Sequence, residues 1–179
     1  MEPLQIAQRL QETFPQEVLG ISEFRGQVSV HLKKDRIVEV CRWLKETPGL
    51  DFDYLQDLCG VDYLGRKSPR FEVVYHLYSI RHRHMLRLRV QVPQEAPSVP
   101  TLTGLYKGAD WHERECYDLL GIRFEGHPDL RRILLPEDWE GHPLRKDYPL
   151  QGMPPEQDWQ GFREVLRKSR QLRGFEWQR

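Results

Sequence analysis

The spacing of proline in the last third of the chain is the feature that most limits its fold. Beyond Gly121, prolines stand at positions 128, 136, 143, 149, 154 and 155. Proline lacks a backbone N–H and fixes φ, so neither a regular helix nor a central strand tolerates this spacing. We therefore predict an extended arm over residues 122–157, with one short strand-like piece at 122–124.

The predicted arm is rich in large apolar side chains. They are Ile133, Leu134, Leu135, Trp139, Leu144 and Tyr148. An irregular segment of roughly thirty residues is usually either disordered or functional. Disorder is a poor fit for so many side chains that favour burial. Because the preceding domain has a core of its own, we expect the arm to be buried against a partner and to fold poorly alone.

Hydrophobic periodicity predicts a helix, a hairpin and a second helix at the N-terminus. The two strands of the hairpin, 18–24 and 27–33, meet at a turn over Arg25-Gly26. The second helix has Asp35 as its N-cap and stops before Pro48-Gly49. The inward-facing residues are Leu4, Ala7, Leu10 and Phe14 in the first helix, and Ile37, Val40, Cys41 and Leu44 in the second.

Alternating apolar and polar residues predict strands further along the chain. Residues 70–79 and 84–92 alternate clearly, so one face of each strand is buried and the other is wet or covered. Residues 52–63 are ambiguous between a helical turn and a strand. This order of elements is typical of an α+β domain. We predict an antiparallel or mixed sheet with helices on one face over residues 1–92.

Three segments follow this domain. Residues 93–121 form a Pro-rich connector and two short helices, at 102–106 and 108–120. The extended arm takes residues 122–157. Residues 158–179 form a basic amphipathic tail helix, which lies on anionic lipid or docks on a neighbouring protein. Because the apolar stripe of this helix is narrow, we favour docking on a protein.

Charge and cysteine content exclude several classes of function. Lys and Arg together number 27, as do Asp and Glu, so no net field draws the chain to nucleic acid or to an anionic membrane. No apolar run approaches the length of a membrane span, and the acidic N-terminus is unlike a signal peptide, so we expect a cytosolic protein. Cys41, Cys59 and Cys116 are odd in number and far apart, which predicts reduced residues rather than disulfides or an iron–sulfur site.

The helix before the arm ends in the sequence WHERECYDLLG, residues 111–121. Gly121 fits a C-terminal cap, and Arg114 with Asp118 is an i,i+4 pair typical of a solvated face. The acids at 113, 115 and 118 do not line one face of a helix, and no nucleophile pattern accompanies them. The residues themselves therefore predict no catalytic, cofactor-binding or metal site.

One enzymatic alternative stays open. His127 and His142 stand in two EGHP turns, and with His112 and nearby carboxylates they suggest a stand-alone metal-dependent hydrolase. His112-Glu113 begins like the zinc motif HExxH, but Cys116 occupies the position of the second histidine. A histidine before a proline in a turn also more often bonds to the backbone. We therefore rank the hydrolase second.

The motif helix and the arm together resemble a known family. The stretches ERECYDLLGIRF (113–124), GHPDLRRIL (126–134) and, after Pro136 and Trp139, GHPLRKDYP (141–149) resemble the signature of the C subunit of the proton-pumping NADH:quinone oxidoreductase, respiratory complex I. Related subunits of the photosynthetic complex and of membrane-bound hydrogenases carry the same signature. Residues 1–110 show only a compatible order of strands and helices.

The resemblance implies a cofactor-free structural subunit with no active site of its own. It implies a place in the peripheral arm of the complex, at the cytoplasmic face of the cell membrane. There the chain lies against the D subunit, which has the fold of a hydrogenase large subunit and helps to form the quinone site. Electrons pass from NADH through FMN and iron–sulfur clusters of other subunits to quinone.

The resemblance also implies a partner interface. In this interpretation the EGHP turns set the path of the arm over its partner, and basic side chains pair with acids along that route. The predicted interface residues are Glu113, Arg114, Glu115, Asp118, His127, Arg131, Arg132, Ile133, Leu134, Trp139, His142, Arg145, Lys146 and Asp147.

Overall fold

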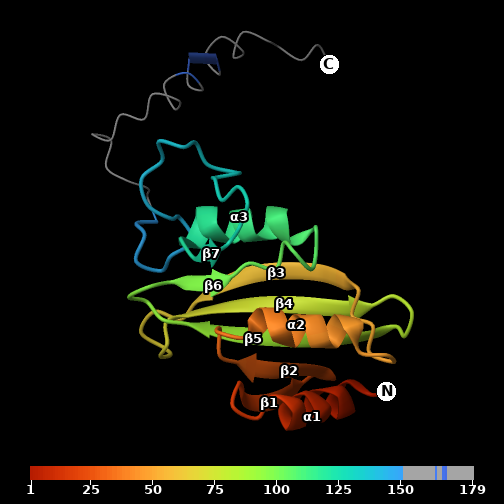
Figure 1. The fold of residues 1–179 in the computed structure, drawn as a ribbon. Coiled ribbons are helices and arrows are strands. Elements are labelled where there is room, and N and C mark those ends of the chain that lie inside the picture. Colours follow the sequence, from red (N-terminus) through yellow and green to blue (C-terminus); the bar gives the residue numbers. More distant parts are fainter. Residues whose placement is uncertain (151–163, 165–166, 169–179) are drawn as a thin grey trace, which may run out of the picture.

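The computed structural model describes residues 1–150 together with residues 164, 167 and 168. The arm follows the last strand and loops above the last helix (Figure 1). The elements in chain order are α1 (Pro3–Thr13), β1 (Val18–Phe24), β2 (Gln27–Leu32), α2 (Ile37–Glu46), β3 (Tyr54–Asp62), β4 (Phe71–Ser79), β5 (His84–Val92), β6 (Ser98–Pro100), α3 (Ala109–Leu120) and β7 (Arg123–Glu125).

Five of the strands form one mixed sheet in the order β1-β2-β5-β4-β3. The pair β2 and β5 is parallel, and the other neighbours are antiparallel. Alternation along β5 buries its apolar residues on one face, while Arg87 and Arg89 point to the other. The predicted α+β class with a mixed sheet is confirmed, and the ambiguous residues 52–63 contain a strand.

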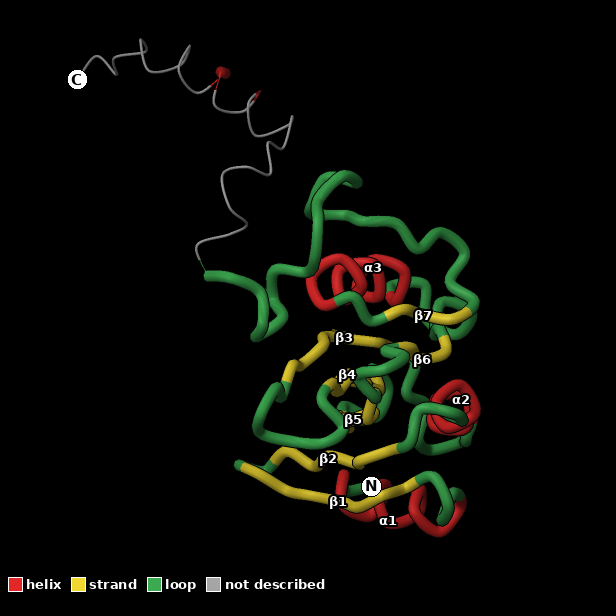
Figure 2. The backbone as a smooth tube through the Cα atoms, turned by 90° about the vertical axis from the view of Figure 1, so that its left-hand side faces the viewer, coloured by secondary structure: helices red, strands yellow, loops and turns green. Residues whose placement is uncertain are grey.

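The helices pack on the apolar face of this sheet. In Figure 2, α1 and α2 stand on one side of the strands and α3 lies next to β3. The predicted inner face of α2 is confirmed, because all four of its residues are buried. In α1, however, Leu4 is 41% exposed and Ile6 is buried in its place. Residues two apart lie on nearly opposite sides of a helix, so only one of them joins the stripe of Ala7 and Leu10.

Gly60 in β3 lets α3 approach the sheet closely. It pairs with Val73 of β4, which is fully buried in the core. A Cβ at this position would overlap the Leu120 side chain and lie 2.8 Å from the Cys116 sulfur. A glycine inside a strand often marks such a close approach. Because of this contact, α3 packs directly against β3, the strand at one edge of the sheet.

The turn between β1 and β2 is the predicted hairpin turn. Arg25 has φ of 52° and Gly26 has φ of 75°. Positive φ at both central residues is the requirement of a type I′ turn, whose twist matches that of the flanking strands. The hairpin over Arg25-Gly26 is thus confirmed.

Two local predictions are wrong, and one strand was missed. Asp35 is not the N-cap of α2, which starts after Arg36 and has no side-chain cap; Arg36 pairs with Glu39 instead. Residues 102–106 form a turn, closed by bonds from the Leu105 and Tyr106 amides to the Leu102 carbonyl, because the helical pattern is too short to propagate. The connector also contains β6, which pairs in parallel with β7 and was not predicted.

The predicted tail helix falls almost entirely outside the described residues. Residues 164, 167 and 168 are helical, and the remainder of 151–179 is not described. Among the helices of the described part, none has the length and apolar character needed to cross a membrane.

Candidate partner interface

The motif helix α3 turns several charged side chains inward. Glu113, Arg114 and Asp118 are buried, and Glu115 between them is exposed. Gly121 ends the helix with φ of 71°, a left-handed conformation that glycine adopts readily, and its amide bonds to the Tyr117 carbonyl. Since the inward face of α3 is charged, the segments packed against it have to supply polar partners.

Asp118 holds the middle of the arm. Its Oδ2 accepts hydrogen bonds from three successive backbone amides, those of Ile133 at 3.1 Å, Leu134 at 2.8 Å and Leu135 at 2.9 Å. Its Oδ1 accepts a bond of 2.7 Å from the Arg132 guanidinium. Burial acts to raise the pKa of Asp118, but these amides and Arg132 outweigh it and lower the pKa. A charged Asp118 thus fastens the arm to its own helix.

Two motif arginines are also used within the chain. Arg132 donates to the carbonyl oxygens of Trp139 at 2.8 Å and Gly141 at 3.0 Å, besides its bond to Asp118. Arg114 donates to the carbonyls of Arg131 and Arg132. The expected pair of Arg114 with Asp118 is therefore replaced by Arg132 with Asp118, because the arm brings a closer guanidinium to the carboxylate.

The second EGHP turn covers the C-terminal end of α3. His142 Nδ1 donates to the Asp118 carbonyl at 2.9 Å, the Leu144 amide to Leu119 at 3.0 Å, and Arg145 Nε to Leu120 at 2.6 Å. The last carbonyls of a helix have no partner within the helix, so these donors complete its end. Burial, with nearby cations, lowers the pKa of His142, which favours the neutral ring.

A buried ion pair at the sheet, Arg70 with Asp62, also binds the arm near residues 146 and 147. Arg70 donates to both carboxylate oxygens of Asp62, at 2.8 and 2.7 Å, and to both oxygens of Asp147, at 3.0 and 2.9 Å. The Lys146 amide adds a bond of 2.8 Å to Asp62. Arg70 is the main cause that lowers the pKa of Asp62 to about 2. Asp62 and Arg70 were missed in the sequence because neither lies in the motif and their partner is distant along the chain.

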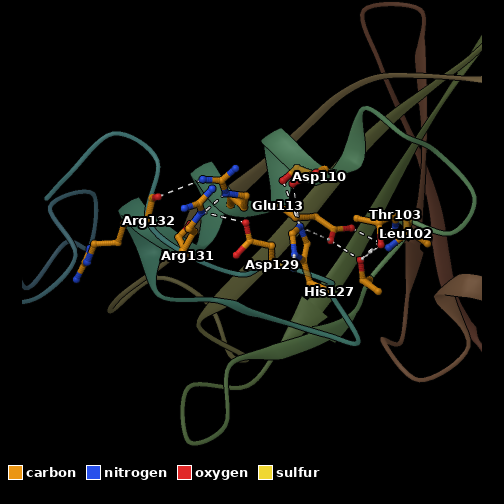
Figure 3. A network of polar contacts seen from close by, with 10 residues as sticks. Leu102, Thr103, Asp110, Glu113, His127, Asp129, Arg131 and Arg132 are labelled. Carbon is orange, nitrogen blue, oxygen red and sulfur yellow. Dashed lines mark hydrogen bonds and ion pairs between the residues drawn. The ribbon is translucent and has the colours of Figure 1, made fainter. Parts of the chain in front are cut away.

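The start of the arm meets a second buried carboxyl group. Glu113 accepts hydrogen bonds from the Leu102 amide at 2.7 Å and the Thr101 hydroxyl at 2.5 Å. His127 Nε2 lies 3.5 Å from the nearest Asp110 carboxylate oxygen and 4.0 Å from Glu113 Oε2. Figure 3 shows this cluster, with Leu102 and Thr103 on one side and the arm residues Asp129, Arg131 and Arg132 on the other. Burial raises the pKa of Glu113 to about 7.

The structure gives the three histidines of the hydrolase alternative separate surroundings. His112 lies 3.8 Å from Asp57 of β3, His127 contacts Asp110, and His142 bonds to the carbonyl of Asp118. Within the described ranges, no group of three or more His, Cys, Asp and Glu residues is arranged to hold a metal ion. The structure therefore lends no support to the hydrolase alternative.

Several other residues lie on the outer surface of α3 and the arm. Trp111 on α3 and Leu134 on the arm are each 62% exposed, and Leu144 is 55% exposed. The Arg131 side chain is also 62% exposed and pairs with Asp129 at 2.9 Å. The arm thus differs from the expectation that its groups await a partner. It folds back on α3 through buried polar groups and presents some apolar groups outward.

Comparison with known proteins agrees with this architecture. Residues 30–154 match the family model described as "Respiratory-chain NADH dehydrogenase, 30 Kd subunit". The C subunit of the NADH-quinone oxidoreductase of Roseiflexus castenholzii is 60% identical over 142 residues, 79% of this chain and 81% of that protein. The C subunit of the Geobacter sulfurreducens oxidoreductase is 50% identical over 144 residues, which are 80% of this chain and 88% of that one.

Solved structures agree as well. A structure described as the trypsin-resistant fragment (1-134) of Nqo5 matches with a TM-score of 0.64 and 34% identity, over 73% of this chain and all of that one. A chain of the archaeal membrane-bound sulfane sulfur reductase shares the fold, with a TM-score of 0.69 and 23% identity, over 84% of this chain and 87% of that one. The family model and the sequence matches place the chain in one family: it belongs to that of the 30-kDa subunit of the respiratory-chain NADH dehydrogenase, which includes the C subunit of NADH-quinone oxidoreductase.

Proposed function

We propose that this chain is a structural subunit in the peripheral arm of a proton-translocating NADH:quinone oxidoreductase and docks on the D subunit through its arm. The chain itself carries no redox centre in this proposal. FMN and the iron–sulfur clusters that pass electrons from NADH to quinone lie in other subunits. The complex holds the chain at the cytoplasmic face of the membrane, without a membrane contact of its own.

The observation that carries the proposal is that the charged and the apolar side chains of the motif region point to different surroundings. Buried Asp118 and the partly buried Arg132 and Arg145 bond within the chain and shape the arm. Apolar side chains of the same motif region, Trp111 and Leu134, are left largely exposed. Single exposed apolar residues are common on protein surfaces, but exposed apolar groups gathered in one region are typical of a docking surface.

The exposed groups also indicate the chemistry of the partner surface. Trp111 is a residue type enriched at interface centres, and the Arg114 guanidinium stacks on it, 5.3 Å from the ring centroid. Leu134 and Leu144 require apolar pockets in the partner. The Arg131 side chain is largely exposed and pairs with Asp129, so an acid of the D subunit is a natural additional partner. We therefore expect a mainly apolar contact with an acidic rim.

Replacing one exposed apolar group with a charge tests the docking surface. Leu134→Asp places a carboxylate in the proposed contact and is expected to weaken co-purification with the tagged D subunit by about tenfold or more. The matched control is Leu19→Asp, since Leu19 is 46% exposed on β1, at the opposite edge of the sheet. Circular dichroism of both isolated variants checks that the fold is kept. Equal retention of the D subunit by the Leu134 variant and the wild type would contradict the proposal.

A further inference from the structure

Glu113 is a buried acid that neither the proposed docking nor the anchoring of the distal arm uses. Its side chain is fully buried, and both of its hydrogen-bond donors, the Leu102 amide and the Thr101 hydroxyl, are uncharged. Within the described part of the chain, its ion-pair partner at 4.0 Å is His127, which is charged only when protonated. An ionised carboxylate in such surroundings has lost water without gaining a permanent cation.

The position of Glu113 makes its charge state matter for two other segments. Thr101 and Leu102 come directly after β6, and His127 comes shortly after β7. The Thr101 amide bonds to the Glu125 carbonyl at 2.9 Å, so the two segments leave their strands side by side. Glu113 therefore anchors to α3 the point from which both the connector and the arm depart.

The groups facing Glu113 come from several elements. Asp110 on α3 is a second acid close to Glu113. Burial is the main cause that raises the pKa values of Tyr75 on β4 and Cys116 on α3, so both of these groups are neutral. The His127 ring accepts the Asp129 amide at Nδ1, so its neutral form carries the proton on Nε2, toward Asp110 and Glu113. With Tyr75 and Cys116 neutral, the cluster contains two acids and one histidine.

We propose that protonation of Glu113 acts as a clamp, which holds the connector and the first turn of the arm firmly on α3 when the carboxyl group is neutral and loosely when it is ionised. Burial is the main cause that raises the pKa of Glu113 from 4.5 to about 7, and Asp110 adds a smaller contribution in the same direction. The two hydrogen bonds act to lower the pKa but do not outweigh burial. The folded chain therefore binds this proton more tightly than the unfolded chain does. The stabilisation is complete below about pH 4.5 and is lost as the pH rises to about 7.

Hydrogen exchange of the Leu102 amide reports on the clamp directly, because that amide bonds to Glu113. In the full chain, the exchange rate corrected for intrinsic chemistry is expected to rise about tenfold between pH 5.5 and 7.5. In Glu113→Gln, whose amide mimics the neutral acid, the corrected rate stays flat. Glu115→Gln is the matched control, since Glu115 is exposed on the same helix, and it is expected to follow the wild type.

A second measurement separates the contribution of Glu113 from that of the neighbouring His127. The carboxyl carbon signal of Glu113, identified by its loss in Glu113→Gln, is expected to titrate with an apparent pKa near 7 in the otherwise unaltered chain. In His127→Asn the pH dependence of Leu102 exchange is expected to persist. A Glu113 signal that titrates below pH 5 overturns the proposal, and so does a pH dependence that vanishes with His127 but survives in Glu113→Gln.

Discussion

Glu113 and Asp118 lie five residues apart on α3, both are fully buried, and their pKa values move in opposite directions. Asp118 receives three backbone amides and the Arg132 guanidinium, whereas Glu113 receives one amide and one hydroxyl. Burial by itself raises the pKa of both groups. The number of hydrogen-bond donors and the presence of the Arg132 guanidinium decide whether the pKa is finally raised or lowered.

The difference means that two buried acids of the same helix hold the neighbouring segments in unlike ways. Asp118 binds the middle of the arm as a permanent anion, and its contribution depends on keeping that charge. Glu113 holds the start of the arm and the connector, and its contribution is largest when the carboxyl group is neutral. The attachment by Asp118 therefore weakens when the pH falls, and the attachment by Glu113 weakens when the pH rises.

The largest expected effect comes from removing the charged attachment. Asp118→Ala leaves the Arg132 guanidinium and three amides without their acceptor, which costs about 3 to 5 kcal/mol in arm stability. Hydrogen exchange of residues 133–135 and trypsin cleavage after Arg131 and Arg132 measure the release of the arm. Far-UV circular dichroism is expected to show an intact sheet.

Glu113→Ala is the matched test of this difference. It removes an acceptor from two uncharged donors, so we expect a smaller cost of about 1 to 2 kcal/mol at about pH 5.5, where the carboxyl group is neutral. The same hydrogen-exchange measurement, followed at Leu102, gives this cost. If the two alanine variants lost equal stability, the contrast between a charged and a neutral attachment would be wrong.

Two neighbouring arginines, Arg132 and Arg131, sharpen the comparison. Arg132→Ala removes the cation of Asp118 and is expected to cost about 2 to 3 kcal/mol in the isolated chain. Arg131→Ala removes an exposed pair with Asp129 and is expected to cost less than about 1 kcal/mol. In a co-purification assay with the D subunit, however, Arg131→Ala should still weaken docking. Denaturant titration of both isolated variants checks the first difference, and equal costs would contradict the assignment of Arg132 to the arm.

The pH dependence of the two attachments gives a further test of the difference. The lowered pKa of Asp118 means that its contribution is present above its ordinary value of 3.8 and is lost as the pH falls below it. Exchange of the Leu134 amide should therefore accelerate only in acid. The Leu102 amide should instead accelerate as the pH rises toward 7, by about tenfold. A pH series of exchange spectra on the wild type checks both, and parallel profiles for the two amides would remove the distinction.

Much of the fold follows from local patterns in the sequence. Strand β5 occupies the predicted residues 84–92, and the hairpin turn at Arg25-Gly26 is as predicted. Both depend on short-range rules, since a half-buried strand alternates with period two and a type I′ turn needs positive φ. The proline spacing likewise determined that the region after β7 has no long regular element in the described residues. The motif identified the family.

Only the tertiary structure decided where the motif charges act. Asp147 meets Arg70, which lies 77 residues away in the sequence, and Lys146 meets Asp62, which is 84 residues away. Asp118 accepts hydrogen bonds from backbone amides 15 to 17 residues further along the chain. Periodicity reports only whether a face is buried, and it predicted a solvated pair for Arg114 and Asp118. Which donor reaches a buried carboxylate depends on the path of the backbone after it turns, and that path is set by packing between segments that are distant in sequence.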